Sequence, residues 1–265
     1  MDQRSKLLRR LIVQALEGGG GGHIGSSLSL VEILRVLYDS TLSYRPQDPS
    51  WSGRDRLSLS KGHGCLALYA ILADKGFFST DELRTFCKPD SRLGGHPGRN
   101  KAPGIEASTG ALGHGLPMGV GMAIEARIRK QSHRVVVVVG DGEINEGSVW
   151  EAAMCASKHR LSNLLVIIDY NKLQSYGLSS EVLNLEPLVY NLGSFGFYVR
   201  ELDGHDITAL EILLRQLPQD DLKPTALICH TIKGSGLPFA EGQAEWHHKS
   251  GLKPDEIVAM YACLE

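Results

Sequence analysis

The sequence predicts a single α/β domain over residues 1–265, with a doubly wound, mostly parallel sheet flanked by helices. Two observations carry this prediction. The apolar runs Val135–Val139 and Leu164–Ile168 do not alternate with polar residues, which is typical of strands buried on both faces of a parallel sheet. Stretches with helical periodicity separate such runs, and this order is typical of an α/β fold.

The N-terminal part of the chain is predicted to contain three helices separated by loops. The first helix lies within residues 1–19, and its apolar face comprises Leu7, Leu8, Leu11, Ile12, Ala15 and Leu16. Further helices are expected over 28–38 and 65–75. Prolines and glycines predict a loop over 44–60 that ends near a short strand, and an ordered surface loop over 90–108.

The C-terminal part of the chain alternates helices with strands. Helices are predicted over 112–130 and 147–160. Strands are predicted, in chain order, over 134–139, 164–169, 198–202 and 225–230. Ligands of such sheets bind at the carboxyl ends of the strands, so the segments that follow the strands are where chemistry is expected.

Composition excludes several classes of protein. The chain carries 28 basic and 30 acidic side chains, and this balance argues against binding of nucleic acid or of a membrane surface. Its apolar runs are far shorter than the ~20 residues of a membrane span, and the N-terminus does not resemble a signal peptide. Five cysteines without a CxxC pair argue against a disulfide framework or a zinc site and favour a cytoplasmic location.

The strongest chemical signal follows the strand at 134–139. Gly140 and Gly142 allow the backbone to approach a ligand closely, and Asp141 between them supplies a hard oxygen ligand. The N-terminus of the next predicted helix favours an anion. Asn171 follows the neighbouring strand and is expected to lie beside Asp141. A carboxylate, an amide oxygen and a backbone carbonyl suit magnesium, so this pattern predicts a site for a diphosphate and a metal ion.

Histidine is the second signal. His23, His63 and His96 each have glycine neighbours, and His247 and His248 form a further pair. Such histidines lie on open backbone, and several together indicate a polar pocket that donates to phosphate or hydroxyl oxygens. Their spacing does not match a zinc site. His133, His159, His205 and His230 lack this context and are interpreted as surface or core residues.

These segments together resemble the thiamine diphosphate-binding half of transketolases. The matching motifs, which run in the family's order from residue 22 to residue 248, are GHIGSSLS, SKGHG, GGHP, STGALGHGL, GDGEINEG, DYNK and EWHH. The resemblance implies transfer of a two-carbon ketol unit from a ketose, for example a sugar phosphate, to an aldose. The cofactor then supplies the electronics, while the protein orients the substrate and moves protons.

The resemblance also implies roles for particular residues. Asp141, Asn171 and the carbonyl of Leu173 would bind Mg²⁺ or Ca²⁺. The residues expected to contact thiamine diphosphate are His63, Gly110, Leu112, Gly140, Asp141, Gly142, Glu143, Asn171 and His247. The residues expected to contact substrate and assist proton transfer are His23, His63, His96 and His247.

Two positions depart from the family pattern. Ile24 stands where full-length transketolases usually have proline, and His248 stands where glycine often follows the substrate histidine. Both departures resemble the variants of transketolases that are split over two genes. They bear on the substrate contacts rather than on the cofactor site.

The resemblance further implies a partner. In the family, the glutamate that activates the cofactor lies on a second, pyrimidine-binding domain, and the 17 residues after His248 leave no room for one. We therefore expect an alpha subunit that is inactive alone and works with a C-terminal, or beta, subunit in an α2β2 heterotetramer.

Three other functions are weighed against this one. The same cofactor chemistry could serve an acyl acceptor or an unusual sugar in a specialised pathway. A non-catalytic, regulatory subunit is a second alternative, and the intact Asp141, Asn171, His63 and His247 weigh against it. A nucleotide-dependent dehydrogenase is disfavoured, because the GxGxxG pattern at Gly20–Gly25 follows a helix rather than a strand.

Overall fold

The centre of the molecule is a five-stranded sheet, as the sequence predicts. The computed structural model describes residues 1–175 and 177–265. Its sheet has the order β2-β3-β4-β6-β5, and all four neighbouring pairs are parallel. The strands are β2 (Arg56–Leu59), β3 (Val135–Gly140), β4 (Leu164–Tyr170), β5 (Tyr198–Asp203) and β6 (Thr225–His230).

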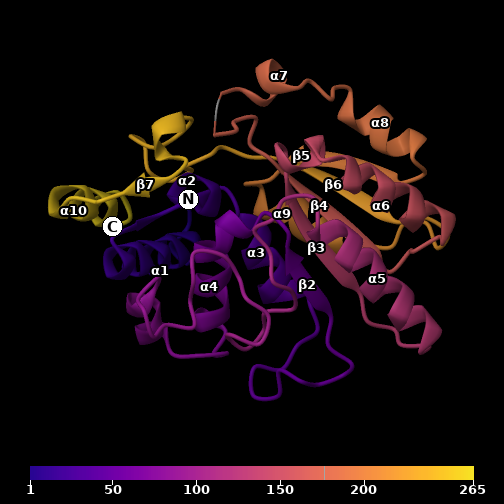
Figure 1. Ribbon diagram of the computed structural model, residues 1–265, viewed down its shortest axis with the longest axis horizontal. Helices are drawn as coiled ribbons and strands as arrows, with labels where there is room; N and C mark the ends of the chain where they lie inside the picture. The colour runs from indigo at the N-terminus through magenta and orange to yellow at the C-terminus, as the bar shows by residue number, and fades with distance from the viewer. Residues whose placement is uncertain (176) are drawn as a thin grey trace.

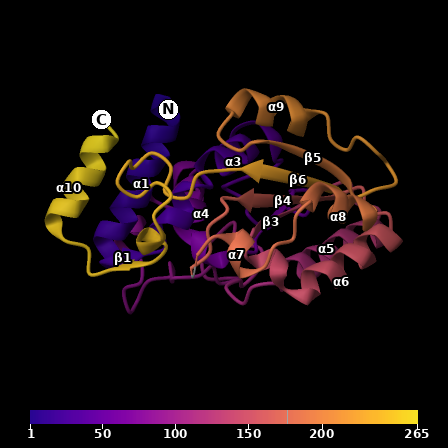
Figure 2. The ribbon, with the colours of Figure 1, turned by 90° about the horizontal axis from the view of Figure 1, so that it is seen from above.

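Helices cover both faces of this sheet, as Figures 1 and 2 show. In Figure 2, α9 lies above the strands, and α5 and α6 lie below them. The N-terminal α1 packs beside the C-terminal α10, so the two ends of the chain lie close together. The helices are α1 (Gln3–Gly19), α2 (Ile24–Leu28), α3 (Val31–Val36), α4 (Cys65–Asp74), α5 (Gly115–Ile128), α6 (Gly147–Lys158), α7 (Ser179–Val182), α8 (Leu188–Ser194), α9 (Ile207–Arg215) and α10 (Pro254–Cys263).

Two hydrophobic cores form, one on each face of the sheet. Val136 and Val138 of β3 face the core that includes α1, α3, α4 and α9. Val135, Val137 and Val139 face the core beneath α5 and α6. Because successive side chains of a strand point to opposite faces, a strand between two helical layers needs apolar residues at every position. This explains the unbroken valine run.

The register of the sheet gathers the strand ends at one edge. Gly140 at the end of β3 is paired with Asp169 of β4, and Tyr170 is paired with His230 at the end of β6. The segments that follow β3, β4 and β6 therefore emerge side by side, and the segment after β2 emerges next to that of β3. This edge carries the candidate site.

The helix expected over 28–38 is instead divided. α2 ends at Leu28, α3 begins at Val31, and Leu37–Thr41 continues as a π-helical turn. Serines interrupt the helix, because Ser27 Oγ donates to the carbonyl of His23 at 2.9 Å and Ser29 Oγ to that of Ser26 at 3.2 Å. Such bonds offer the backbone an alternative to the helical ladder.

Three further details differ from the sequence-based prediction or extend it. Leu7 is expected on the buried face of α1, but the structure leaves it 44% exposed. β5 lies at an edge of the sheet, and its side chains are half-buried or exposed. A short antiparallel pair, β1 (Gly21–Gly22) with β7 (Lys249–Ser250), ties the two ends of the chain together. Among the described residues, no helix is both long and apolar enough to cross a membrane.

Candidate functional site

One pocket of about 400 Å³ lies at the carboxyl ends of β2, β3, β4 and β6. It brings together all the site residues that the sequence indicated, although these are spread over most of the chain. They are His23, His63, His96, Gly110, Leu112, Gly140, Asp141, Gly142, Glu143, Asn171, Leu173 and His247.

Four of the predicted histidines form one cluster in this pocket. The ring centroid of His23 lies 5.5 Å from that of His63, 6.0 Å from that of His96 and 5.4 Å from that of His247. The exposed His248 joins the cluster at its rim, with its ring centroid 4.5 Å from that of His23. The convergence confirms that these glycine-flanked histidines share one pocket.

The buried imidazoles are neutral at pH 7. Burial, together with the nearby His248, lowers the pKa of His23 to about 4. Burial and the ammonium of Lys233 lower the pKa of His247 to about 3. Burial also holds the pKa of His63 well below its usual value. A neutral imidazole donates a hydrogen bond at one nitrogen and accepts at the other, which suits contact with hydroxyl groups.

The three predicted metal ligands lie at the tips of β3 and β4. Asp141 is buried, and its carboxylate accepts from the Ser179 hydroxyl at 2.8 Å. Asn171 Oδ1 accepts from the backbone N–H of Leu173 at 3.2 Å. Within 1–175 and 177–265, no group of three His, Cys, Asp or Glu side chains could hold a metal ion. A metal here would therefore need the amide and carbonyl oxygens in addition to Asp141.

The predicted cofactor residue Glu143 joins three loops of the pocket. Its carboxylate accepts from the N–H of Gly113 at 2.9 Å, from the N–H of Gly140 at 3.1 Å and from the hydroxyl of Ser60. Gly110 packs against His96, since a Cβ added to Gly110 would lie 2.8 Å from that ring. The glycine-rich loops thus approach one another through backbone, with a buried carboxylate between them.

A buried ion pair beneath the pocket was not predicted. Lys61 is 1% exposed and pairs with Asp169, which is fully buried. Asp169 also accepts from Ser29 Oγ at 2.7 Å and from Thr231 Oγ1. Burial opposes ionisation of Asp169, but Lys61 and these hydroxyls outweigh it and hold its pKa below the usual value. This pair joins the ends of β2, β4 and β6.

A second buried lysine, Lys233, was also missed. Its ammonium donates to the carbonyl of Leu173 at 2.5 Å, so this predicted metal ligand already faces a cation. Burial and the nearby Lys61 lower the pKa of Lys233 to about 8. Among the described residues, Lys233 has no carboxylate within ion-pairing distance. A buried ammonium without a counter-ion favours an anionic ligand.

Three buried side-chain atoms in this pocket have no hydrogen-bond partner among the described residues, and we call them orphan atoms. They are Ser26 Oγ, Gln174 Nε2 and His247 Nδ1. Buried polar groups are normally partnered, so three orphan atoms around one cavity indicate a polar ligand. The donor set therefore fits a metal-bound diphosphate with a polar ring system.

Sequence signals existed for some of the missed residues. Lys61 lies within the SKGHG motif, and Lys233 lies in the segment directly after β6, where chemistry was expected. Asp169 lies at the end of β4, but a carboxylate there does not reveal its partner. We find no local signal that singles out Ser26 or Gln174.

The fold and this pocket define a diphosphate-binding α/β enzyme domain. A sequence profile described as "Transketolase, thiamine diphosphate binding domain" matches residues 2–264. The chain therefore belongs to the transketolase family, as a thiamine diphosphate-binding domain.

Similar proteins include single subunits of split transketolases. The chain is 43% identical to one subunit of the apulose-4-phosphate transketolase of Actinobacillus succinogenes, over 97% of this chain and 93% of that protein. It is 38% identical to the 6-deoxy-6-sulfo-D-fructose transketolase subunit SqwG of a Clostridium species, over 94% and 90%. The chain is thus a transketolase-type transferase subunit, which corresponds to the first of the two subunits in two-component transketolases. Such lettered subunit names imply a second subunit.

Solved transketolases have the same fold. The structure superposes on the transketolase of Leishmania mexicana with a TM-score of 0.92 and 30% identity, over all of this chain and 41% of that one. For the enzyme of Campylobacter jejuni the TM-score is 0.90 at 29% identity, over 98% and 42%. The chain thus spans about two fifths of the solved transketolases that it matches.

Proposed function

We propose that the chain is the alpha subunit of an enzyme that moves a two-carbon ketol unit from a ketose phosphate, or a related anionic ketose, to an aldose. The observation that carries the proposal is the pocket, which combines Asp141, Asn171, two lysines and four imidazoles with three orphan atoms. The printed names of two relatives contain a phosphate or a sulfo group, which supports an anionic ketose.

In this proposal the strand tips hold the metal and the diphosphate. Asp141, Asn171 Oδ1 and the carbonyl of Leu173 are the ligands of Mg²⁺ or Ca²⁺. Lys233 supplies positive charge to the diphosphate oxygens. Gly142 keeps the approach to the diphosphate open, since a Cβ there would lie 2.9 Å from the side chain of Gln174.

The imidazoles line the space where substrate is held. Bound thiamine diphosphate supplies the carbon nucleophile that protein side chains lack. His23, His63, His96 and His247 hold the substrate hydroxyls and move protons, because neutral imidazoles donate and accept at once. Gly110 and Leu112 pack near the cofactor rings.

The proposal includes a beta subunit that carries the pyrimidine-binding domain and its activating glutamate, in an α2β2 heterotetramer. The relatives named as single subunits, which the chain matches over 88–93% of their length, support this arrangement. Residues 1–265 then form one thiamine diphosphate-binding domain. We also propose a cytoplasmic location, on the strength of the odd number of cysteines, all of them free.

Cofactor binding by the assembled enzyme tests the site. We expect Asp141→Ala to weaken Mg²⁺-dependent binding of thiamine diphosphate by about a hundredfold or more, because it removes the only charged metal ligand. Asp221→Ala is the matched control, since Asp221 is exposed and precedes β6 at the opposite end of the sheet. Titration calorimetry measures both. Equal affinity of the Asp141→Ala variant and the wild type would refute the site.

Turnover tests the division of labour between the two proteins. The full chain with its beta subunit should transfer a ketol unit from a ketose phosphate to an aldose, and the chain alone should not. Robust turnover by the chain alone would contradict the two-subunit proposal. Tight cofactor binding without any ketol transfer would point to another acceptor.

A further inference from the structure

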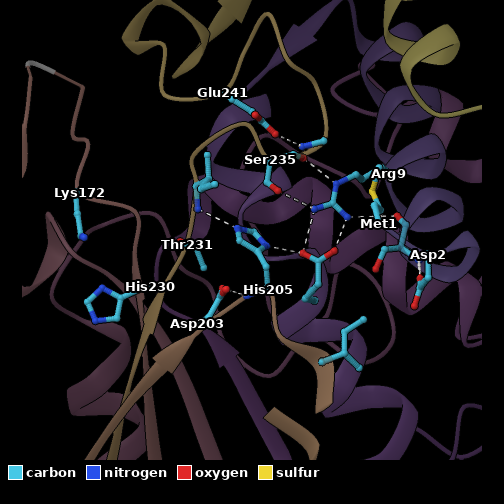
Figure 3. A pocket seen from close by; sticks show the side chains of 15 residues that line it. Met1, Asp2, Arg9, Lys172, Asp203, His205, His230, Thr231, Ser235 and Glu241 are labelled. Atoms are coloured by element: carbon cyan, nitrogen blue, oxygen red, sulfur yellow. Dashed lines mark hydrogen bonds and ion pairs between the residues drawn. The ribbon is translucent and has the colours of Figure 1, made fainter. Parts of the chain in front are cut away.

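A second cavity, of about 670 Å³, lies beside the segment 231–236, which we call the Lys233 loop. Lys233 lines the cofactor pocket, whereas Thr231, Ile232, Ser235 and Gly236 line this second cavity. The loop therefore separates the two spaces. Figure 3 shows the side chains around the second cavity, with Arg9, Ser235 and His205 pointing toward one another.

A buried ion pair supports the loop from this side. Arg9 of α1 is 1% exposed and Glu32 of α3 is 4% exposed. Their two parallel contacts measure 2.6 Å from Nη1 to Oε1 and 3.0 Å from Nη2 to Oε2. Arg9 Nε then donates to the carbonyl of Ser235 at 2.8 Å, and Nη2 donates to Ser235 Oγ at 3.3 Å (Figure 3).

His205 makes the second connection to the loop. Its Nε2 lies 2.9 Å from the backbone nitrogen of Ile232, and its Nδ1 lies 2.9 Å from Glu32 Oε2. A backbone N–H can only donate, so Nε2 is the acceptor and the ring proton is on Nδ1, facing the carboxylate. Burial alone would raise the pKa of Glu32, but hydrogen bonds from His205 and Arg9 lower it to about 2. The carboxylate that orients His205 is therefore ionised.

The loop needs such external support. Gly234 and Gly236 have φ values of +82° and +94°, which lie in the left-handed region that glycine enters freely. Within the loop's surroundings, the N–H of Gly234 also donates to the carbonyl of Gly25 at 2.9 Å. A segment with two such glycines has little stiffness of its own, so its bonds to the rest of the protein set the position of Lys233.

We propose that Arg9, Glu32 and His205 form a clamp that positions Lys233 in the cofactor pocket. Each of the three side chains already has its polar atoms engaged by the protein, which favours a positioning role over a ligand site in the second cavity. His205 is the positioning residue whose bond to Ile232 lies next to Lys233 in the chain. The consequence for cofactor binding rests on the function proposed above.

Two substitutions at His205 separate its two hydrogen bonds. In His205→Gln, the amide oxygen reaches the position of Nε2 and still accepts from Ile232. In His205→Asn, the shorter amide reaches only the position of Nδ1, so it keeps the bond to Glu32 and loses the one to the loop. The probe is Mg²⁺ with thiamine diphosphate, titrated into the full chain assembled with its beta subunit. Hydrogen exchange of the Ile232 amide is followed in parallel.

We expect His205→Asn to raise the dissociation constant about tenfold and to speed exchange at Ile232 by a similar factor. His205→Gln should stay within about threefold of wild type in both measurements. Equal effects of the two substitutions, or none, would overturn the clamp, because a general structural role does not distinguish them.

Two further results keep the proposal independent of the variants and of the proposed function. Nitrogen chemical shifts of wild-type His205 should show the proton on Nδ1, and a proton on Nε2 would overturn the clamp. If the wild-type enzyme bound no thiamine diphosphate, the proposed function would fail. The difference at the Ile232 amide between the Asn and Gln variants would still decide whether the clamp exists.

Discussion

Two polar centres lie on either side of the Lys233 loop, and they differ in whether their buried polar atoms have partners. In the cofactor pocket, three orphan atoms have no partner in the part of the chain that the structure describes. In the clamp, all three nitrogens of the Arg9 guanidinium donate, and both ring nitrogens of His205 are engaged. The comparison teaches that unsatisfied buried groups mark where a ligand binds, whereas satisfied ones mark where the chain is held.

The same contrast separates the two buried lysines of the cofactor pocket. Lys61 is paired with the fully buried Asp169, which hydroxyl groups also surround. Lys233 donates only to a backbone carbonyl, that of Leu173, among the described residues. Lys61 therefore resembles the clamp, and Lys233 resembles the orphan atoms, although both line one pocket.

The largest expected effect comes from the same substitution at the two lysines. Lys61→Met should lower the free energy of unfolding by about 3–5 kcal/mol, because it leaves the Asp169 carboxylate buried without its counter-ion. Lys233→Met should leave stability within about 1 kcal/mol of wild type, since it strands no carboxylate. It should instead weaken thiamine diphosphate binding about ten- to a hundredfold, the loss expected for one charged hydrogen bond.

Urea unfolding of the full chain measures the first effect, and titration of the assembled enzyme measures the second. Lys75→Met is a control for removal of a lysine from a partly exposed ion pair, with Asp39, and should cost about 1 kcal/mol or less. Comparable stability losses for Lys61→Met and Lys233→Met would break the comparison, because they would show that both lysines hold the fold.

How much the sequence could predict follows the same division. The valine run of β3 predicted a buried parallel strand, because burial on both faces demands apolar residues at every position. The glycine-flanked histidines and Asp141 were found because each lies in a distinctive local motif. Their convergence in one pocket followed from the family resemblance, and the structure confirms it.

The clamp and the buried lysine pair could not be predicted in this way. Glu32 meets a histidine 173 positions later in the chain, and Lys61 meets Asp169 at a separation of 108 positions. Pairing at such distances depends on the packed sheet and leaves no periodic or motif signal. From the sequence alone, His205 is therefore interpreted as an ordinary surface or core residue. Leu7 is misplaced for the opposite reason, since its apolar spacing extends beyond the face that α1 buries.

Acid unfolding sharpens the comparison, because the two centres titrate in different ranges. Burial lowers the pKa of His23 to about 4 from 6.5, so the folded state binds fewer protons than the unfolded state between these values. Stability in the pocket should therefore fall as the pH drops from 6.5 toward 4. The pKa of Glu32 is lowered to about 2 from 4.5, so the clamp should lose stability only as the pH drops below 4.5.

Urea titrations of the full chain at a series of pH values resolve the two ranges. His23→Asn should flatten the fall between pH 6.5 and 4 and leave the range below 4 unchanged. Glu32→Gln should lower stability at neutral pH and flatten the fall below pH 4.5, with the upper range as in wild type. A flattening of the lower range by His23→Asn would mean that the two centres are coupled.

The smallest expected effects come from two serines, one on each side of the Lys233 loop. Ser26 Oγ is an orphan atom of the cofactor pocket, and Ser235 Oγ accepts from Arg9 at 3.3 Å in the clamp. Ser26→Ala should leave stability unchanged or slightly higher, because it removes a buried hydroxyl without a partner among the described residues. It should weaken thiamine diphosphate binding about three- to tenfold, by loss of one hydrogen bond.

Ser235→Ala should show the reverse pattern. It should lower the free energy of unfolding by about 0.5–1.5 kcal/mol, because Arg9 loses one buried acceptor. Binding should change by less than about threefold, since Arg9 Nε still donates to the Ser235 carbonyl at 2.8 Å and keeps the loop in place. Because both substitutions remove a single hydroxyl, a loss of stability in Ser26→Ala equal to that in Ser235→Ala would show that the partners of a buried group do not distinguish a binding site from a structural one.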